Sequence, residues 1–222
     1  MALAGRGAVA IWHDIAPEGR DEFYAWHGRE HMPERVAIPG FLRGRRFVAV
    51  DGTPEFFNLY ETVSAAVLTG ADYLARLNAP TPWTTATVTH FRGVARSLCE
   101  VAATYGEGLG GLCATLRYDV PASAAGAHRA AMTAALRDLA SGAGIAGAHL
   151  LVADEAASGI ETAERRARGG ERNLVPRWIV LVEGWGDQHA FIAACRTFAA
   201  AGAFAAAAGA PELAVYRLQS QR

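Results

Sequence analysis

The fold is decided by WHDI at residues 12–15, FYAWHGREHMPER at residues 23–35 and IPGF at residues 38–41. The middle stretch predicts a helix, and an α-helix turns by about 100° per residue. On that wheel one stripe of side chains lies within about 80° of Phe23. Its members are Trp26, His27, Glu30, His31 and Glu34. The stripe begins aromatic and then becomes two imidazoles and two carboxylates.

This stripe places ionisable groups on the face that a helix normally packs against a sheet. Burying such groups is costly unless they are paired or used in chemistry. Arg29 points away from the stripe, and Arg35 lies beyond its edge. The pattern therefore predicts a polar cleft between a helix at 18–35 and its sheet.

The same stretches resemble the dimeric α+β barrel superfamily, and within it the EthD-like group of ferredoxin-like domains. The likeness covers residues 6–105 and rests on His31 before Pro33, on the turn at 39–41 and on the Arg-rich strand at 43–47. Such relatives include cofactor-free monooxygenases, lactone isomerases and polyketide-tailoring enzymes. The resemblance therefore implies a fold more firmly than it implies a reaction.

Composition and charge exclude several classes of function. The 222 residues suffice for one large domain or two small ones, and 51% are hydrophobic. A formal net charge of −1 provides no basic excess for a phosphate backbone. The chain contains no lysine, which excludes Schiff-base chemistry and a Walker-type phosphate loop.

The cysteines are odd in number and far apart: Cys99, Cys113 and Cys195. They have neither zinc-site spacing nor a disulfide framework, so we expect reduced thiols. No apolar run approaches 18 residues, and the N-terminus is too polar for a signal peptide. The sequence predicts a cytoplasmic protein that binds no nucleic acid and no membrane.

The chain reads as two copies of one β-α-β-β-α-β pattern. The clearest matches are 11–15 with 116–120, 38–41 with 145–148, and 56–62 with 178–184. The predicted helices lie near 18–35, 64–77, 124–140 and 187–200, and the remaining strands near 41–50, 93–104, 148–153 and 212–218. The expected fold class is α+β: two fused ferredoxin-like repeats whose antiparallel sheets pack as a pseudo-dimeric α+β barrel. The predicted domains are 1–107 and 108–222, joined by a linker at 106–111.

The two copies differ where the first carries its polar stripe. Alignment of the repeats places Met132, Ala135 and Leu136 opposite His27, Glu30 and His31. We expect one active half and one structural half, although drift of a repeat whose histidines serve only the core would give the same pattern. The second copy also contains an insertion at 154–172, which lacks apolar periodicity. It is predicted to be a mobile, passive surface loop, with a lid as the alternative.

Proton transfer is the chemistry that the stripe favours, because a histidine beside a carboxylate titrates near neutrality. His31 is the first candidate for general acid and base, with Glu30 or Glu34 to orient it. His27 and His13 complete the predicted catalytic set. For each histidine the alternative is a hydrogen-bonded core residue.

Residues 27–31 also fit the His-x-x-Glu-His zinc pattern. Gly28 weakens the helix that would present it, and Pro33 follows closely. We predict no metal and no cofactor. Haem, which chlorite-dismutase-like relatives bind through a histidine of the second half, would require His128, His149 or His189, none of which lies in a familiar pattern.

The predicted substrate-binding side chains are aromatic or hydrogen-bonding: Trp12, Trp26, Arg46, Asn58, Tyr60, Trp83 and His90. Trp12 and His13 point to opposite faces of the first strand, so the sequence leaves open which of them lines the cleft. A turn is expected at 81–83.

We predict a cofactor-independent enzyme of the isomerase, lyase or monooxygenase type. Its expected partner is a small aromatic or polyketide-like molecule. The alternative is a small-molecule binding protein without catalysis. A homodimer of the whole chain is left open.

Overall fold

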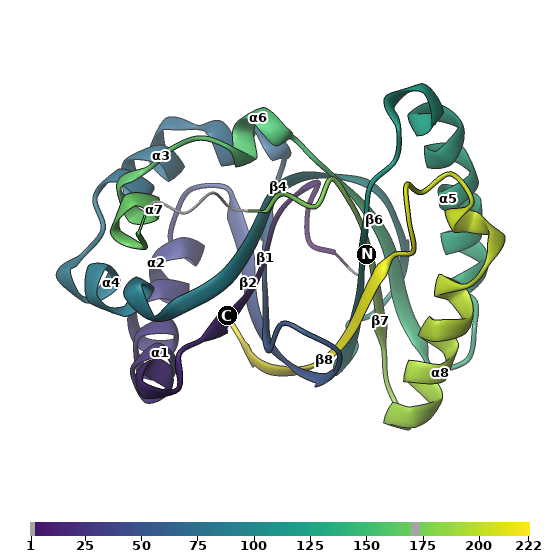
Figure 1. Ribbon diagram of the computed structural model, residues 1–222, viewed down its shortest axis with the longest axis horizontal. Helices are drawn as coiled ribbons and strands as arrows, with labels where there is room; N and C mark the ends of the chain where they lie inside the picture. The colour runs from purple at the N-terminus through teal and green to yellow at the C-terminus, as the bar shows by residue number, and fades with distance from the viewer. Residues whose placement is uncertain (1–2, 170–173) are drawn as a thin grey trace.

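The computed structural model describes residues 3–169 and 174–222. Within these residues eight strands close into a barrel in the order β1-β3-β2-β8-β5-β7-β6-β4, with every neighbouring pair antiparallel. The strands are β1 (Gly7–Ile15), β2 (Phe41–Asp51), β3 (Phe56–Thr62), β4 (Phe91–Gly106), β5 (Leu112–Tyr118), β6 (Ile145–Ala153), β7 (Trp178–Gly184) and β8 (Glu212–Gln221). The helices lie outside the barrel, on two opposite sides (Figure 1).

The helices divide into two groups that cover opposite sides of the barrel. On one side lie α1 (Arg20–Trp26), the π-helix η2 (His27–His31), α2 (Met32–Val36), α3 (Ala71–Asn78) and α4 (Pro82–Thr87). On the other side lie α5 (Ala125–Leu139) and α8 (Gln188–Ala199) (Figure 1). Short 3-10 turns occur at Pro17–Gly19, Ala65–Thr69, Val88–His90, Ala122–Ala124 and Gly202–Phe204. No helix in the described ranges is long and apolar enough to span a membrane.

Each half of the chain contributes four adjacent strands, in the orders β4-β1-β3-β2 and β8-β5-β7-β6. The halves join where β2 pairs with β8 and β4 pairs with β6. Alternate side chains point into the barrel, where a buried apolar cluster includes Trp12, Phe57, Leu181 and Tyr216. The predicted α+β barrel is confirmed at this level, and the third strand of each half has the predicted bounds.

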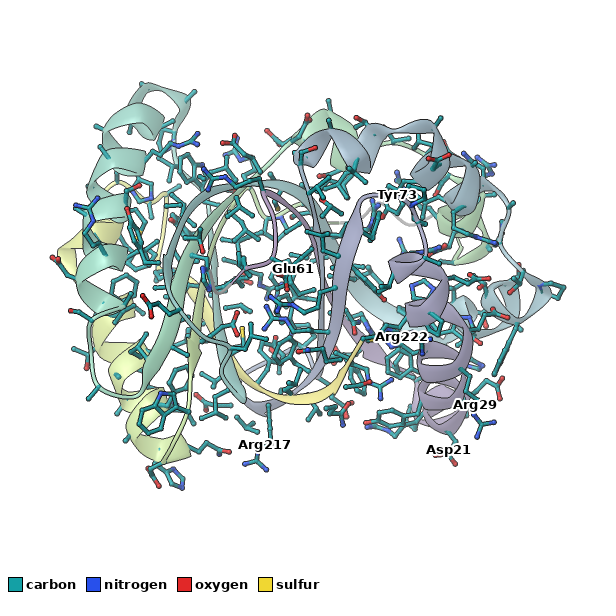
Figure 2. All side chains as sticks on the ribbon, turned by 180° about the vertical axis from the view of Figure 1, so that it is seen from behind. Asp21, Arg29, Glu61, Tyr73, Arg217 and Arg222 are labelled. Carbon is teal, nitrogen blue, oxygen red and sulfur yellow. The ribbon has the colours of Figure 1, made fainter. Side chains whose placement is uncertain are left out.

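A buried ionic cluster joins the two halves inside the barrel. Arg45 of β2 is fully buried, and its guanidinium lies 2.7 Å from Oε2 of Glu183 and 3.0 Å from Oε1 of Glu61. Figure 2 shows Glu61 within the barrel, whereas Tyr73 lies among the helices outside it. Burial opposes ionisation of Glu183, but His149 and Arg45 beside it hold its pKa at about 2. Such a pair fixes the register between halves, because breaking it would leave a buried charge unpaired.

Two predicted local features differ in the structure. The stretch expected to turn at 81–83 begins α4: the Thr81 side chain accepts from the Thr84 N–H, and Pro82 occupies the first turn, where its missing N–H costs nothing. The expected single helix at 18–35 is instead three segments, α1, η2 and α2.

The insertion expected to be a passive loop forms α6 (Glu155–Ser158) and α7 (Ala163–Ala167). Figure 1 shows α7 beside α3 and α4, on the side covered by the first half of the chain, whereas α6 lies against β4. We call residues 154–169 the cover segment. Residues 170–172 of the predicted insertion lie outside the described residues.

Candidate functional site

A π turn sets the orientation of the polar helix face. The N–H of Met32 donates to the carbonyl of His27, five residues earlier. This wide turn takes up about one extra residue, so the side chains that follow rotate back by about 100° relative to a regular helix. Met32, which a regular helix would place opposite Phe23, is therefore only 2% exposed, and Arg35, expected beyond the edge of the stripe, is only 4% exposed. Pro33 suits this geometry because it has no N–H and would clash with a carbonyl in a regular helix.

This face encloses a small cavity against the outer surface of β1 and β3. Its volume is about 50 Å³. The lining from the first half includes Trp26, His27, His31, Arg35, Asn58 and Tyr60, with Ile11, Tyr73, Leu77, Val88, Phe91 and Arg96 around them. The cover segment adds Glu164 and Arg168. Ligand pockets usually measure about 300–1,000 Å³, so this cavity is too small for an aromatic ligand in its present form.

The hydrogen bonds of His27 determine its tautomer. A guanidinium N–H of Arg46 donates to Nδ1 at 3.3 Å, so the neutral ring carries its proton on Nε2. Burial, and then the charge of Arg46, hold the pKa of His27 well below its usual value. Nε2–H therefore donates to the Tyr60 oxygen at 3.2 Å. The phenolic proton of Tyr60 remains available to a ligand in the cavity.

His31 offers the cavity an imidazole nitrogen without a partner. Its Nδ1 is buried and makes no hydrogen bond, and the residue as a whole is only 7% exposed. The ring lies 4.2 Å from the Trp26 ring and 6.2 Å from that of Tyr60, measured between centroids. Burial, followed by the charge of Arg35, holds the pKa of His31 well below its usual value. The ring is therefore neutral near pH 7, ready to accept a proton or a hydrogen bond.

Arg35 brings a buried positive charge to the same cavity. Its Nη2 pairs with a carboxylate oxygen of Glu164 on α7, while Nη1 is buried without a hydrogen-bond partner. Arg96 also lines the cavity and donates to the Tyr73 hydroxyl at 2.8 Å. A buried donor with no partner is costly, so Nη1 of Arg35 is a place where a ligand oxygen would be stabilised.

His13 lies one layer behind the cavity and holds Asn58. The Asn58 amide N–H donates to Nε2 of His13 at 2.9 Å. The carbonyl oxygen of the Asn58 side chain has no hydrogen-bond partner. Burial lowers the pKa of His13 to about 3. His13 is therefore neutral and acts on the cavity through Asn58, which lines it.

The structure brings together only part of the predicted site. Five predicted residues line the cavity: His31, His27, Trp26, Asn58 and Tyr60. Arg46 and His13 contact these residues from behind. The others lie elsewhere, namely Glu30, Trp12, Trp83 and His90.

The remaining predicted residues have structural partners that explain their positions. Glu30 accepts hydrogen bonds from Thr81 at 2.6 Å and Thr84 at 3.2 Å, which ties the π turn to α4. Trp12 faces the barrel interior and donates to Thr115 at 3.2 Å, which answers the question of strand orientation: His13, and not Trp12, is on the helix side. Glu34, the other proposed orienting carboxylate, lies 3.6 Å from Arg76.

Sequence reasoning missed Arg35, Arg96 and Glu164. Arg35 was missed because the regular wheel ignores the π turn, for which Pro33 two residues after His31 was the available signal. Glu164 lies in a segment without apolar periodicity, so its packing on the other half had no local signature.

Three of the histidines weighed for zinc or haem, His27, His128 and His149, are engaged by other side chains. In the described ranges, no group of three or more His, Cys, Asp or Glu is placed to hold a metal ion. Both nitrogens of His27 face hydrogen-bond partners. His149 is fully buried, with Thr104 2.8 Å from its Nδ1, and His128 pairs with the Tyr118 hydroxyl at 3.0 Å. His189 lies exposed on α8.

No family model matches the sequence, and no curated protein matches it. Solved structures share the fold. An anthrone oxidase-like protein matches with a TM-score of 0.67 and 13% identity, over 100% of this chain and 95% of that one. A monooxygenase-like protein from Fusobacterium nucleatum matches with a TM-score of 0.58 and 9% identity, over 99% and 95%. A heme-binding protein from Thermus thermophilus matches with a TM-score of 0.51 and 12% identity, over 97% and 92%. At these identities the likeness is one of fold.

Proposed function

We propose that the protein is a cofactor-independent enzyme that removes a proton from carbon beside a carbonyl group in a small aromatic or polyketide-like molecule. The observation that carries this proposal is that His31 and Arg35 line the same cavity and that each has a buried nitrogen without a hydrogen-bond partner, Nδ1 of His31 and Nη1 of Arg35. One is a neutral base and the other is a cationic donor. Proton abstraction needs these two groups on either side of one substrate.

His31 is the proposed base. Its neutral form dominates near pH 7 because burial and Arg35 disfavour the imidazolium ion. Once the substrate has lost its proton, the resulting enolate lies between His31-H⁺ and Arg35. The new negative charge stabilises the imidazolium, so a base that is weak in the empty site becomes adequate during the reaction.

Tyr60 and Arg35 are the proposed donors to the developing oxyanion. The Tyr60 hydroxyl receives the Nε2–H of His27 and keeps its own proton for the substrate oxygen. Burial raises the pKa of Tyr60, so the hydroxyl stays protonated and acts as a donor. Donors that are already oriented toward the new charge need no rearrangement during the reaction.

The names of the structural neighbours favour oxidation as the subsequent step. One neighbour is anthrone oxidase-like and another is monooxygenase-like. An anthrone is a tricyclic aromatic ketone whose central methylene group loses a proton readily. The resulting carbanion would react with O₂, converting the methylene group to a carbonyl while the second oxygen atom leaves as water. The flat aromatic walls formed by Trp26 and Phe91 suit such a substrate.

We also propose that the chain is a tandem ferredoxin-like repeat of the EthD-like group. The identical strand order of the two halves supports this proposal. The second half would then be the copy that lost its site, and the protein would work without metal or haem. His27, His128 and His149 do not fit as metal or haem ligands, because other side chains occupy their nitrogens or enclose them.

The test is turnover of a substrate panel by the purified protein. Anthrone and related hydroxyaryl ketones are incubated with the protein in air and under nitrogen, and the products are identified by mass spectrometry. Conversion to the quinone in air, with one O₂ consumed per molecule, supports oxidation. Isomerised or cleaved product under nitrogen would reassign the class. Ligands that bind without any conversion would instead make this a binding protein.

A further inference from the structure

The small cavity can admit an aromatic ligand only if part of its wall moves. A volume of about 50 Å³ admits only a few water molecules, since one water needs about 10–15 Å³ on the same measure. The first wall is formed by barrel strands. The second is formed by the segments from α1 to α2, in which Trp26 and Met32 are almost fully buried. The third wall is the cover segment.

Within the cover segment, α6 is more deeply buried than α7. Ser158 at the end of α6 is buried, and its hydroxyl accepts the N–H of Leu98 at 2.9 Å. In contrast, α7 has only five residues and none of them is buried. Its contacts with the first half include the hydrogen bond from the N–H of Ala163 to Asn78 at 3.0 Å and the ion pair between Glu164 and Arg35. The pair between Glu164 and Arg35 joins α7 to the cavity lining.

The charge of buried Arg35 is only partly matched by its partner. Among the described residues that line the cavity, Glu164 is the one carboxylate, and the lining also includes Arg96 and Arg168. Glu164 engages only Nη2 of Arg35, and Nη1 has no partner. A guanidinium offers two parallel N–H groups that match a carboxylate or another anionic oxygen pair. Glu164 thus fills half of an anion site.

We infer that Glu164 is a resident substitute for the anionic group of the ligand, so that a small aromatic anion takes its place on Arg35 and α7 moves aside. This inference rests on the proposed function, because it names the substrate class of the same site. The incoming anion supplies the charge that buried Arg35 requires, and Glu164 is released to solvent. A neutral ligand would have to break the pair without replacing it, so we expect the cavity to bind an anionic aromatic ligand more tightly than its neutral counterpart, although both can enter.

The experiment compares 2-naphthoate with its neutral isostere 2-naphthamide by isothermal titration calorimetry. We expect the wild-type protein to bind naphthoate at least about 10-fold more tightly, which is about 1.4 kcal/mol. Glu164→Gln should tighten naphthoate binding several-fold, because the competing carboxylate is gone. Glu161→Gln is the matched control: it removes an exposed carboxylate of the same segment, which lies 3.7 Å from Arg166, and should leave both affinities unchanged.

A double variant tests the role of Arg35 without leaving a buried charge unpaired. Arg35→Gln with Glu164→Gln should lose the preference for naphthoate, provided that thermal unfolding shows a folded protein. The inference fails if wild type does not distinguish the two probes, if neither wild type nor Glu164→Gln binds naphthoate at millimolar concentration, or if the double variant keeps the preference. These titrations need no turnover, so the anion preference and the proposed catalysis can fail separately.

Discussion

The first helical segments of the two halves pack on matching parts of one barrel, yet they present opposite chemistry to it. In the second half α5 is a continuous 15-residue helix that buries Met132 and Leu136 completely. In the first half α1 and α2 are separated by the π turn, and the buried side chains include His27, His31 and Arg35. The barrel supplies the rigid wall in both halves. The difference lies in the π turn, which contains about one extra residue, and in the polar side chains that this turn directs toward the barrel.

The second half also shows what the first would be without a site. Its own histidine, His128, bonds to Tyr118 and packs edge-on against Trp178, and Phe204 covers the same tyrosine. The insertion of this half crosses to the other side of the barrel, where it closes the cavity of the first half. Under the proposed function, one half of the chain is structural, and a segment of that half completes the site of the other.

The largest expected effect is on turnover, and it belongs to the first half alone. His31→Ala should lower kcat by about 10²–10⁴, because it removes the general base. His128→Ala, which removes the buried histidine of α5 in the second half, should leave kcat per folded molecule unchanged. Steady-state kinetics on a substrate found in the panel would measure both, with circular dichroism to verify folding. Equal losses in the two variants would erase the distinction between the halves.

Much of this comparison was predictable, and the exceptions have physical causes. A regular wheel correctly grouped Trp26, His27 and His31, which line the cavity. It misplaced Arg35, which follows the π turn. The pattern of the two copies predicted the order of elements along the chain and the bounds of the third strand in each half, because such bounds can be read from the local run of apolar residues. The packing position of an irregular segment depends on long-range contacts, which leave no local pattern in the sequence. The position of the cover segment could therefore not be predicted.

The next effect concerns stability and belongs to the second half. Met132→Ala should lower the free energy of unfolding by about 2–5 kcal/mol, as for other fully buried methionines that are truncated. Its kcat per folded molecule should equal that of wild type. Urea denaturation followed by tryptophan fluorescence gives the stability. A loss of less than about 1 kcal/mol would mean that α5 is not the packed counterpart that the comparison requires.

Acidification should destabilise the first half before the second. Burial holds the pKa values of His13, His27 and His31 below the ordinary value, so the unfolded state binds protons below about pH 6.5 while the folded state does not. Stability is therefore complete above that pH and falls as the pH falls, by up to about 1.4 kcal/mol per pH unit for each histidine.

Hydrogen exchange read by mass spectrometry at pH 7 and pH 5, corrected for the intrinsic rates, locates this loss. Protection of α1 and α2 should decrease more than protection of α5. The opposite order, or no change in either half, would show that these histidines are not the neutral buried groups described above.

The smallest effect separates two causes of the π turn. Gly28 in the turn and Gly126 in α5 both have open space where a Cβ would be placed. If Pro33 causes the wide turn, Gly28→Ala and Gly126→Ala should each raise stability by about 0.4–1 kcal/mol. Thermal unfolding of the two variants would measure this. A stabilised Gly126→Ala together with a destabilised Gly28→Ala would mean that the turn depends on the glycine itself.

Proton removal by His31 in the first-half cavity is the central claim, and hydrogen exchange into the substrate tests it most directly. Anthrone is incubated under nitrogen in D₂O, and deuterium entering its methylene group is followed by NMR. Wild type and Met132→Ala should accelerate the exchange above the buffer rate, whereas His31→Ala should not. Exchange by His31→Ala at the wild-type rate would contradict the account, because the proton would then be removed without the group to which the site is assigned.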